Sequence, residues 1–376
     1  MQTRTLGRTG MTVGAISLGT EYLLGQSRAD ITRVIHAAVE RGVSYYDIFW
    51  PQPDFRAHLG AAFAERRERV LLSAHLGAVM DGAQYAVSRD PALCERYFAD
   101  YLRLLGTDYV DVLFLHNSND AADLDALFAP GGLLERAQAH VRAGRARAIG
   151  FSGHNAATAR RAVESGAIDV LMFPVNFTSQ VVPGFDALLA ACEQHQVALV
   201  AMKVFAGGRL LRAQTTLEVD EFLMGRAETS GGPTRFAVDR PATPLQCLAY
   251  VLNEPAVSTT VPGCRSVAEL EGVLAYYDAA PAERDYAALL PAFSHYPEGQ
   301  CVYCNHCLPC AVDLDIGALV RLLDEAGAAP TPEQRAAYEA LAGQASDCIQ
   351  CGDCEARCPF GVPVIERLEA AAALYE

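Results

Sequence analysis

YVDVLFLH at residues 109–116 and ARAIGFS at residues 146–152 are two mostly apolar, strand-like runs. Between them lies LLERAQAHVRA at residues 133–143, whose apolar positions follow helical spacing. A strand, a helix and a second strand in this order are typical of parallel strands joined by a helical crossover. The stretch therefore predicts one βαβ unit.

The same alternation extends in both directions along the chain. Further strands are expected at residues 14–18, 43–47, 70–75, 169–173, 198–202 and 257–261. Further helices, several of which open with Asp, Asn or Thr as a cap, are expected at residues 30–41, 91–105, 156–164 and 243–253. Eight units predict an α/β fold, the closed (β/α)8 TIM barrel. The competing fold, a doubly wound open sheet, normally has a GxGxxG turn after its first strand, and Gly19-Thr20-Glu21 offers none.

Chemistry in such barrels lies where the strands end, so we expect Asp47, His75, His116, Ser152 and Lys203 to meet at one mouth. Residues 217–240 contain several glycines and are interpreted as a long loop. Such a loop could fold over a bound ligand or be a surface excursion.

Composition restricts the classes of partner. The chain has 376 residues, of which 51% are hydrophobic and 20% charged, and this length favours a large domain followed by a smaller one. Its formal net charge of -15 repels phosphate backbones and anionic membrane surfaces, so nucleic acid and membranes are not expected as partners. We find no stretch with the pattern of a signal peptide or a membrane span, and a cytoplasmic location is expected.

Eight of the twelve cysteines lie within residues 301–358. The first run is CxxCxxCxxC and the second is CxxCxxCxxxCP, the spacing of ferredoxins, in which the fourth cysteine of each run ligates the cluster of the other run. This spacing predicts two [4Fe-4S] clusters, the first held by Cys301, Cys304, Cys307 and Cys358, the second by Cys348, Cys351, Cys354 and Cys310. Structural zinc sites are the alternative, but they need only pairs of CxxC and leave the triple spacing unexplained.

The strand–helix alternation ends near residue 280, which places the barrel at residues 1–285 and a small, mainly helical, ferredoxin-like domain at residues 286–376. The other four cysteines, Cys94, Cys192, Cys247 and Cys264, are interpreted as buried thiols.

Several segments resemble the aldo/keto reductase superfamily, in its bacterial branch with a C-terminal ferredoxin-like domain. They are TLGRTGMTVGAISLGT, GVSYYD, DYVDVLFLH, AIGFSGHN, VALVAMKVFAGG and STTVPGCRSVAELE, in the family's order. The resemblance implies a barrel with an NADP(H) or NAD(H) site across its mouth, and hydride transfer between nicotinamide and a carbonyl or alcohol.

The family's catalytic residues are Asp, Tyr, Lys and His, and this chain departs from that set. Asp47 and His116 match, but Gln52 stands at the tyrosine position and His75 at the lysine position. A glutamine amide has no accessible acidic pKa, whereas an imidazole titrates near neutrality. His75 or His116 could therefore take over proton transfer, with Asp47 as counter-charge, while Gln52 orients a carbonyl. The alternative for His75 is a polar residue that only fills the barrel top.

The resemblance also implies a set of cofactor contacts. The glutamine expected near Met172 is missing, Met202 takes the usual aromatic position, and Arg265 suits a ribose 2′-phosphate. The residues expected to bind the cofactor are Ser152, Asn155, Lys203, Gly207, Gly208, Gly263, Arg265 and Ser266.

These observations predict an iron–sulfur oxidoreductase that interconverts a carbonyl and an alcohol of a small oxygenated substrate with NAD(P)(H). Two alternatives stay open. One is an electron-transfer enzyme that is fed by the clusters, with an external ferredoxin or another carrier as partner. The other is a non-redox isomerase or lyase that uses histidine acid–base chemistry. Exchange between nicotinamide and the clusters would need a two-to-one electron converter such as a flavin, and no segment indicates a flavin site.

Overall fold

The computed structural model describes residues 2–179, 182–212, 215–219, 234–238, 240–293, 299, 301, 303, 305, 307–327, 329–358 and 361–376. Cys304 and most of the loop expected at residues 217–240 lie outside the described residues. At the edges of that loop, β12 (Thr215–Val219) and β13 (Thr234–Val238) pair antiparallel.

An eight-stranded sheet forms the centre of the molecule, and its neighbouring strands are parallel. In spatial order its strands are β3 (Leu18–Gly19), β4 (Tyr45–Asp47), β5 (Leu71–Leu76), β8 (Val110–Leu115), β9 (Ala146–Ser152), β10 (Val170–Pro174), β11 (Ala198–Met202) and β14 (Val257–Thr260). Parallel bridges between Ile16 and Thr260 and between Gly19 and Gly263 join the two outer strands, so the sheet closes on itself. The predicted barrel is confirmed.

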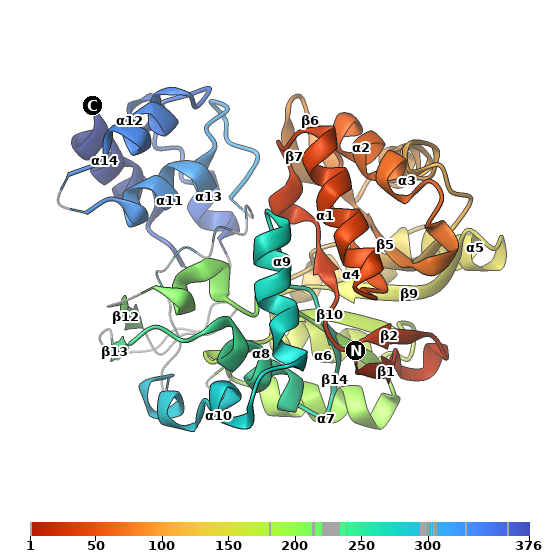
Figure 1. Ribbon diagram of the computed structural model, residues 1–376. Coiled ribbons are helices and arrows are strands. Elements are labelled where there is room, and N and C mark those ends of the chain that lie inside the picture. The colour runs from red at the N-terminus through yellow and green to blue at the C-terminus, as the bar shows by residue number, and fades with distance from the viewer. Residues whose placement is uncertain are drawn as a thin grey trace.

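Helices surround the barrel (Figure 1). They are α1 (Arg28–Glu40), α2 (Pro53–Phe63), α3 (Pro91–Leu105), α4 (Ala121–Phe128), α5 (Leu133–Arg142), α6 (Ala156–Glu164), α7 (Phe185–His195), α8 (Pro244–Asn253), α9 (Val267–Leu274) and α10 (Pro281–Arg284). Ser27, Asp90, Asn155 and Thr243 cap α1, α3, α6 and α8 through side-chain oxygens that accept backbone N–H groups. The expected Asn and Thr caps of α6 and α8 are confirmed, whereas α1 begins two residues before Asp30, which therefore lies in the first turn of the helix and is not its cap.

Besides the pair of β12 and β13, the described part of the chain contains two further antiparallel hairpins. One pairs β1 (Thr3–Thr5) with β2 (Thr12–Gly14), and the other pairs β6 (Ala78–Asp81) with β7 (Gln84–Val87). The second hairpin follows β5 directly and turns at Gly82, whose φ of 58° favours glycine. It was not among the predicted elements, and it bears on the site described below.

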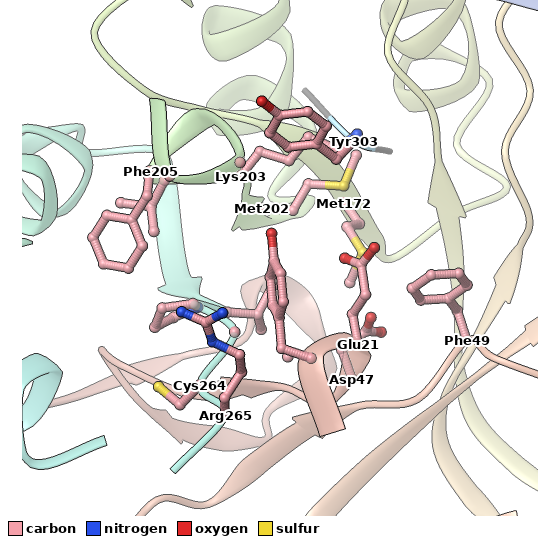
Figure 2. A pocket seen from close by; sticks show the side chains of 18 of the residues that line it. Glu21, Asp47, Phe49, Met172, Met202, Lys203, Phe205, Cys264, Arg265 and Tyr303 are labelled. Carbon is pink, nitrogen blue, oxygen red and sulfur yellow. The ribbon is translucent and has the colours of Figure 1, made fainter. Parts of the chain in front are cut away.

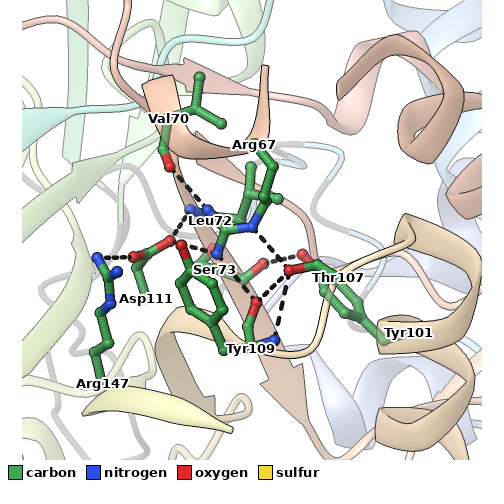
Figure 3. A network of polar contacts seen from close by, with 9 residues as sticks. All are labelled: Arg67, Val70, Leu72, Ser73, Tyr101, Thr107, Tyr109, Asp111 and Arg147. Carbon is green, nitrogen blue, oxygen red and sulfur yellow. Dashed lines mark hydrogen bonds and ion pairs between the residues drawn. The ribbon is translucent and has the colours of Figure 1, made fainter. Parts of the chain in front are cut away.

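A polar network holds the N-terminal ends of β5, β8 and β9 together (Figure 3). The carboxylate of Asp111 is fully buried and accepts hydrogen bonds from the Leu72 backbone N–H at 2.8 Å and from Arg67 and Arg147 at 2.9 Å each. Both guanidinium groups also lie over the Tyr109 ring, 4.0 and 4.6 Å from its centroid. We call this set of residues the floor network.

Beyond the barrel, α11 (Ile316–Glu325), α12 (Pro332–Glu339), α13 (Asp353–Arg357) and α14 (Val364–Tyr375) form a separate group of helices (Figure 1). α11 packs against α14, and Tyr338 of α12 stacks on Tyr375 with ring centroids 4.5 Å apart. Arg209, which follows β11, pairs with Asp324 of α11 at 2.6 Å and ties this group to the barrel. Within the described part of the chain, no helix has the length and apolar character that crossing a membrane requires.

Candidate active site

A cavity of about 390 Å³ opens at the C-terminal ends of the barrel strands, within the usual range for small-molecule sites. Asp47 ends β4, His75 lies near the end of β5, His116 follows β8, Ser152 ends β9 and Lys203 follows β11. All five side chains line the cavity, so the structure brings together the residues that strand position alone had grouped. Figure 2 shows Asp47 and Lys203 among the residues around this space.

A row of hydrogen bonds runs along one side of the cavity. Asp47 Oδ1 lies 2.9 Å from His75 Nε2, His75 Nδ1 lies 2.8 Å from His116 Nδ1, and His116 Nε2 lies 2.5 Å from the hydroxyl of Tyr85. Asp47 Oδ1 also accepts a hydrogen bond from the Ser73 hydroxyl at 2.6 Å. Every member of this row is less than a tenth exposed. We call Asp47, His75, His116 and Tyr85 the proton row.

Aromatic rings fix the orientation of the proton row. Phe49 stacks on His116 with centroids 5.9 Å apart and meets the Tyr85 ring edge-on at the same distance. Trp50 packs edge-on against Tyr85 at 5.2 Å, and Phe114 stacks on His75 at 4.8 Å. Trp50 thus supports the wall from behind, because it packs on Tyr85 and does not itself line the cavity.

Another part of the wall is apolar and sulfur-rich. Met172, near the middle of β10, and Met202, at the end of β11, both line the cavity and lie together in Figure 2. Cys264 also lines the cavity, but burial, reinforced by Glu269, raises the pKa of its thiol to about 12. That thiol stays protonated at neutral pH and is not an activated nucleophile.

The groove beside Lys203 has room for a phosphate. Gly207 and Gly208 line it with φ of 66° and 85°, a conformation that favours glycine, and a Cβ at Gly208 would meet no atom within 4 Å. Farther along, one carboxylate oxygen of Glu269 lies 3.1 Å from the Arg265 guanidinium, and the other accepts the Arg265 backbone N–H at 2.7 Å. Arg265 therefore already holds an oxyanion, and because the pair is exposed, a phosphate could displace Glu269 at small cost.

Three of the expected residues lie outside the cavity wall. Gln52 precedes α2, Asn155 Oδ1 accepts the Thr158 backbone N–H as the cap of α6, and Ser266 accepts the Glu269 N–H as the cap of α9. Gly263 does line the cavity, and its missing side chain leaves room for the Tyr22 ring, 2.2 Å from where a Cβ would lie.

The C-terminal helices supply part of the cavity wall. Tyr303, two residues after Cys301, and Arg321 of α11 both line it. The Arg321 guanidinium lies 4.5 Å from the ring centroid of Tyr303 and 5.5 Å from that of Tyr22. Burial opposes its charge, but Tyr22, Tyr303 and Glu325 raise the pKa of Arg321 on balance. The site is therefore shared between the barrel and the cysteine-rich region.

Four cysteines surround a second, small cavity. Cys310, Cys348, Cys351 and Cys354 line it together, which are the four assigned to the second cluster from spacing. In both runs the backbone N–H two residues on donates to the first cysteine sulfur, from Tyr303 to Cys301 at 3.3 Å and from Gln350 to Cys348 at 3.4 Å.

The residue before the last cysteine of the second run contacts the first run. Arg357, which precedes Cys358, donates to the Cys307 carbonyl at 2.9 Å. Among the side chains that the structure describes, no three His, Cys, Asp or Glu groups are already arranged as a metal-ion site.

Comparison with known proteins places this geometry in a family. The model described as Aldo/keto reductase family matches residues 10–290. The chain belongs to the aldo/keto reductase family. Members are oxidoreductases that act on small molecules and generally use NAD(P)H. The family match ends before Cys301, so the cysteine-rich region lies beyond it.

One curated relative and two solved structures are similar to this chain over about three quarters of its length. Pyridoxal 4-dehydrogenase of Microbacterium luteolum is 24% identical over an alignment 318 residues long, which covers 73% of this chain and 92% of that protein. The holo form of AKR11C1 from Bacillus halodurans has a TM-score of 0.63 at 21% identity and covers 79% of this chain and 98% of its own. PA4992 of Pseudomonas aeruginosa has a TM-score of 0.55 at 20% identity, and the match covers 73% of this chain and 94% of that protein. At this identity the two solved structures support the fold alone.

Three residues of the site were missed by sequence reasoning: Tyr85, Tyr303 and Arg321. For Tyr85 a signal existed, because Gly82-Ala83 stands between AVMD and QYAV, and two residues that begin with Gly between such runs predict a hairpin. Tyr303 and Arg321 reach the cavity only through packing between distant parts of the chain, for which a single sequence carries no local signal.

Proposed function

We propose that this chain interconverts a carbonyl and an alcohol of a small oxygenated substrate with NAD(P)(H), and that its buried histidine pair moves the proton. The observation that carries the proposal is the contact of 2.8 Å between His75 and His116 beside a 390 Å³ cavity. Two imidazole rings that are hydrogen-bonded to each other, one of them also to a carboxylate, form a path on which a proton can enter or leave the cavity.

The chain's own residues divide the work. Asp47 balances positive charge on His75, and Ser73 holds the carboxylate in place from the other side. The aromatic wall of Phe49 and Phe114 keeps water away from the pair and fixes both rings. With the proton path along one side, the reacting oxygen of the substrate belongs next to the row and its carbon skeleton against Met172 and Met202.

The residues present fit a nicotinamide dinucleotide. Gly207 and Gly208 would flank the pyrophosphate, Arg265 would hold a ribose 2′-phosphate, and Ser152 would lie beside the nicotinamide end. When bound, the nicotinamide supplies or receives the hydride. Ser152 Oγ already accepts the Asn117 backbone N–H at 2.9 Å, which orients it at the mouth.

The test is nicotinamide turnover by the purified full chain against a panel of alcohols and aldehydes, followed at the nicotinamide absorbance band. The panel includes pyridoxal, because one relative carries the name pyridoxal 4-dehydrogenase. We expect turnover with at least one member, and a loss of about a hundredfold or more in both His75→Ala and His116→Ala. Unchanged turnover in both variants would remove the histidine role.

We also propose that residues 286–376 form a ferredoxin-like domain with two [4Fe-4S] clusters, after a barrel at residues 1–285. Cys301, Cys304, Cys307 and Cys358 would hold one cluster, and Cys348, Cys351, Cys354 and Cys310 the other. The four cysteines around one cavity and the N–H groups directed at sulfur support the assignment. When bound, the clusters would supply one-electron transfer.

Metal analysis tests the cluster proposal without reference to activity. Protein purified without oxygen should contain about eight iron and eight sulfide per chain, as two four-iron clusters require. Stoichiometric zinc without sulfide would show zinc sites instead. Cys358→Ser should damage the cluster of Cys301 and Cys307, and loss confined to the Cys348 cluster would contradict the exchanged pairing.

One observation favours a second function, an enzyme fed by the clusters with an external ferredoxin or another carrier as partner. Tyr303 lies between two proposed ligands, Cys301 and Cys304, and also lines the cavity. Mixing flavin-free protein with excess NADPH under anaerobic conditions separates the two functions, with dithionite as positive control. The first function predicts that NADPH alone leaves the cluster absorbance unbleached, since no flavin converter is indicated. Turnover that requires reduced clusters and ignores nicotinamide would establish the second.

A further inference from the structure

The hairpin formed by β6 and β7 places a tyrosine in the cavity that the family pattern does not account for. Tyr85 lines the cavity and is 4% exposed, and its hydroxyl lies 2.5 Å from His116 Nε2. Gln52, which stands at the family's tyrosine position, lies outside the wall. The phenol group in this site therefore comes from a different part of the chain than the family's tyrosine.

Hydrogen-bond rules give the proton row a direction. An ionised Asp47 only accepts, so His75 donates from Nε2 and, as a neutral ring, accepts at Nδ1. His116 must then donate from Nδ1 and accept at Nε2, so the Tyr85 hydroxyl donates to it. Each proton points toward Asp47, and the Tyr85 hydroxyl, which donates to His116, lies at the end of the row in the cavity wall.

The structure assigns Tyr85 as the catalytic residue that exchanges the proton with the substrate oxygen, and the two histidines and Asp47 as positioning residues that pass the charge on. This rests on the proposed carbonyl–alcohol function. In the oxidative direction, the substrate C–H bond breaks, and a bound oxidised nicotinamide would take up its electron pair as hydride. The O–H bond also breaks, and its electrons form the second carbon–oxygen bond.

The released proton binds to Tyr85 Oη as the proton already there moves to His116 Nε2. The proton on His116 Nδ1 then moves to His75 Nδ1, which leaves a His75 imidazolium beside the Asp47 carboxylate. In the reductive direction the same atoms return the proton to the new alcohol. The direction of the hydrogen bonds at rest fits the uptake of a proton, and therefore fits alcohol oxidation.

The local structure explains how a hairpin residue can be held firmly enough. The Tyr97 hydroxyl on α3 donates to the Met80 carbonyl of β6 at 3.4 Å. Gln84, next to Tyr85, accepts the Cys310 backbone N–H at 2.6 Å and donates to Asp313 at 2.7 Å. Both strands of the hairpin are thus tied to neighbouring elements, and Trp50 and Phe49 confine the Tyr85 ring itself.

Tyr85→Phe removes only the hydroxyl, and Tyr97→Phe removes a hydroxyl from the same hairpin contact outside the cavity. We expect Tyr85→Phe to lower kcat by about a hundredfold or more, with KM within about threefold and an unchanged unfolding midpoint. Tyr97→Phe should keep the turnover of the natural chain. Equal turnover in Tyr85→Phe and the natural chain would overturn the assignment and leave the proposed function standing.

A second measurement needs neither cofactor nor substrate. Histidine labelled with nitrogen-15 reports the tautomer of each ring by NMR, and His116→Gln assigns the signal. We expect His116 to carry its proton on Nδ1 in the natural chain and its Nε2 resonance to shift in Tyr85→Phe but not in Tyr97→Phe. If the His116 resonances are the same in the natural chain and in Tyr85→Phe, the proposed hydrogen bond from Tyr85 to His116 is wrong. If the spectra agree but no panel member drives nicotinamide turnover, the proposed function fails, and with it the catalytic role of Tyr85.

Discussion

The two ends of the barrel each bury a carboxylate but neutralise it differently. At the floor, Asp111 is held by two arginines and a backbone N–H. At the mouth, Asp47 is held by a serine hydroxyl and an imidazole. Guanidinium stays charged at every pH that the protein experiences, whereas imidazole gains and loses its proton near neutrality. The floor network is therefore electrostatically fixed, and under the proposed function the proton row is the part that changes charge.

The two carboxylates are also linked to the same strand. Ser73 of β5 donates its hydroxyl to Asp47, and its carbonyl accepts the Tyr101 hydroxyl at 2.8 Å on the side of the floor network (Figure 3). One rigid strand thus supports a set of fixed charges at one end and a movable proton at the other. The comparison teaches that burial of a carboxylate does not by itself indicate catalysis. The residue type that binds the carboxylate, arginine or histidine, determines whether a proton can move there.

The largest effect should come from the floor. Asp111→Asn keeps the shape but leaves Arg67, whose side chain is 13% exposed, without its counter-charge. Breaking such a buried pair costs about 3–5 kcal/mol of unfolding free energy. Denaturant titration measures the loss, and activity per folded molecule should stay normal. A stable Asp111→Asn protein with reduced kcat would show that the floor takes part in catalysis.

The corresponding change at the mouth should affect turnover more than stability. Asp47→Asn keeps a hydrogen-bonding group beside His75 but removes the charge that balances an imidazolium. We expect kcat to fall by about a hundredfold, equivalent to about 2.7 kcal/mol, with KM within about threefold. Steady-state kinetics and denaturant titration of the same sample make the comparison. A loss of stability as large as that of Asp111→Asn would erase the distinction between the two ends.

Arg265, at the rim of the mouth, tests how the exposure of an arginine affects stability. We compare it with Arg67, which is the same residue type but is far less exposed. The Arg265 side chain is 63% exposed, unlike Arg67. Arg265→Ala should therefore leave stability nearly unchanged and weaken NADPH binding by about tenfold, since only the phosphorylated ribose loses a charge-assisted contact. Titration calorimetry with NADPH and NADH checks this. Equal weakening of both would remove the phosphate role.

The smallest effect is expected from the partner of that arginine. Glu269→Gln removes the carboxylate that Arg265 now holds, so a 2′-phosphate no longer has to displace it. Because an exposed ion pair contributes at most about 1 kcal/mol, NADPH should bind no more than about fivefold more tightly, with NADH unaffected. Weaker NADPH binding in Glu269→Gln would indicate that Glu269 itself contacts the cofactor.

Local pattern predicted the barrel well. The strands at residues 146–152 and 198–202 and the helices at 91–105 and 156–164 have the predicted bounds, because buried apolar runs and capping residues are local signals. The grouping of Asp47, His75 and His116 followed from strand ends alone.

The parts that were not predicted depend on contacts across the fold. Tyr85 reaches His116 only because the hairpin of β6 and β7 places it there, and Arg321 of α11 reaches the cavity only because α11 packs beside it. Asn155 and Ser266 show the opposite case. Their side chains serve as helix caps, a role that competes with ligand binding and that the family resemblance alone did not separate.

The hydrogen bond between the Gln84 side chain and the Cys310 backbone has a thermodynamic consequence. The Gln84 amide joins the hairpin of Tyr85 to the backbone of Cys310, which does not line the mouth cavity. Coupling between two sites is reciprocal. An ordered hairpin therefore stabilises the Cys310 loop by the same free energy by which an ordered Cys310 loop stabilises the hairpin. A molecule bound against Tyr85 would then raise the affinity of the Cys310 loop for iron, and iron bound there would raise the affinity for that molecule by the same factor.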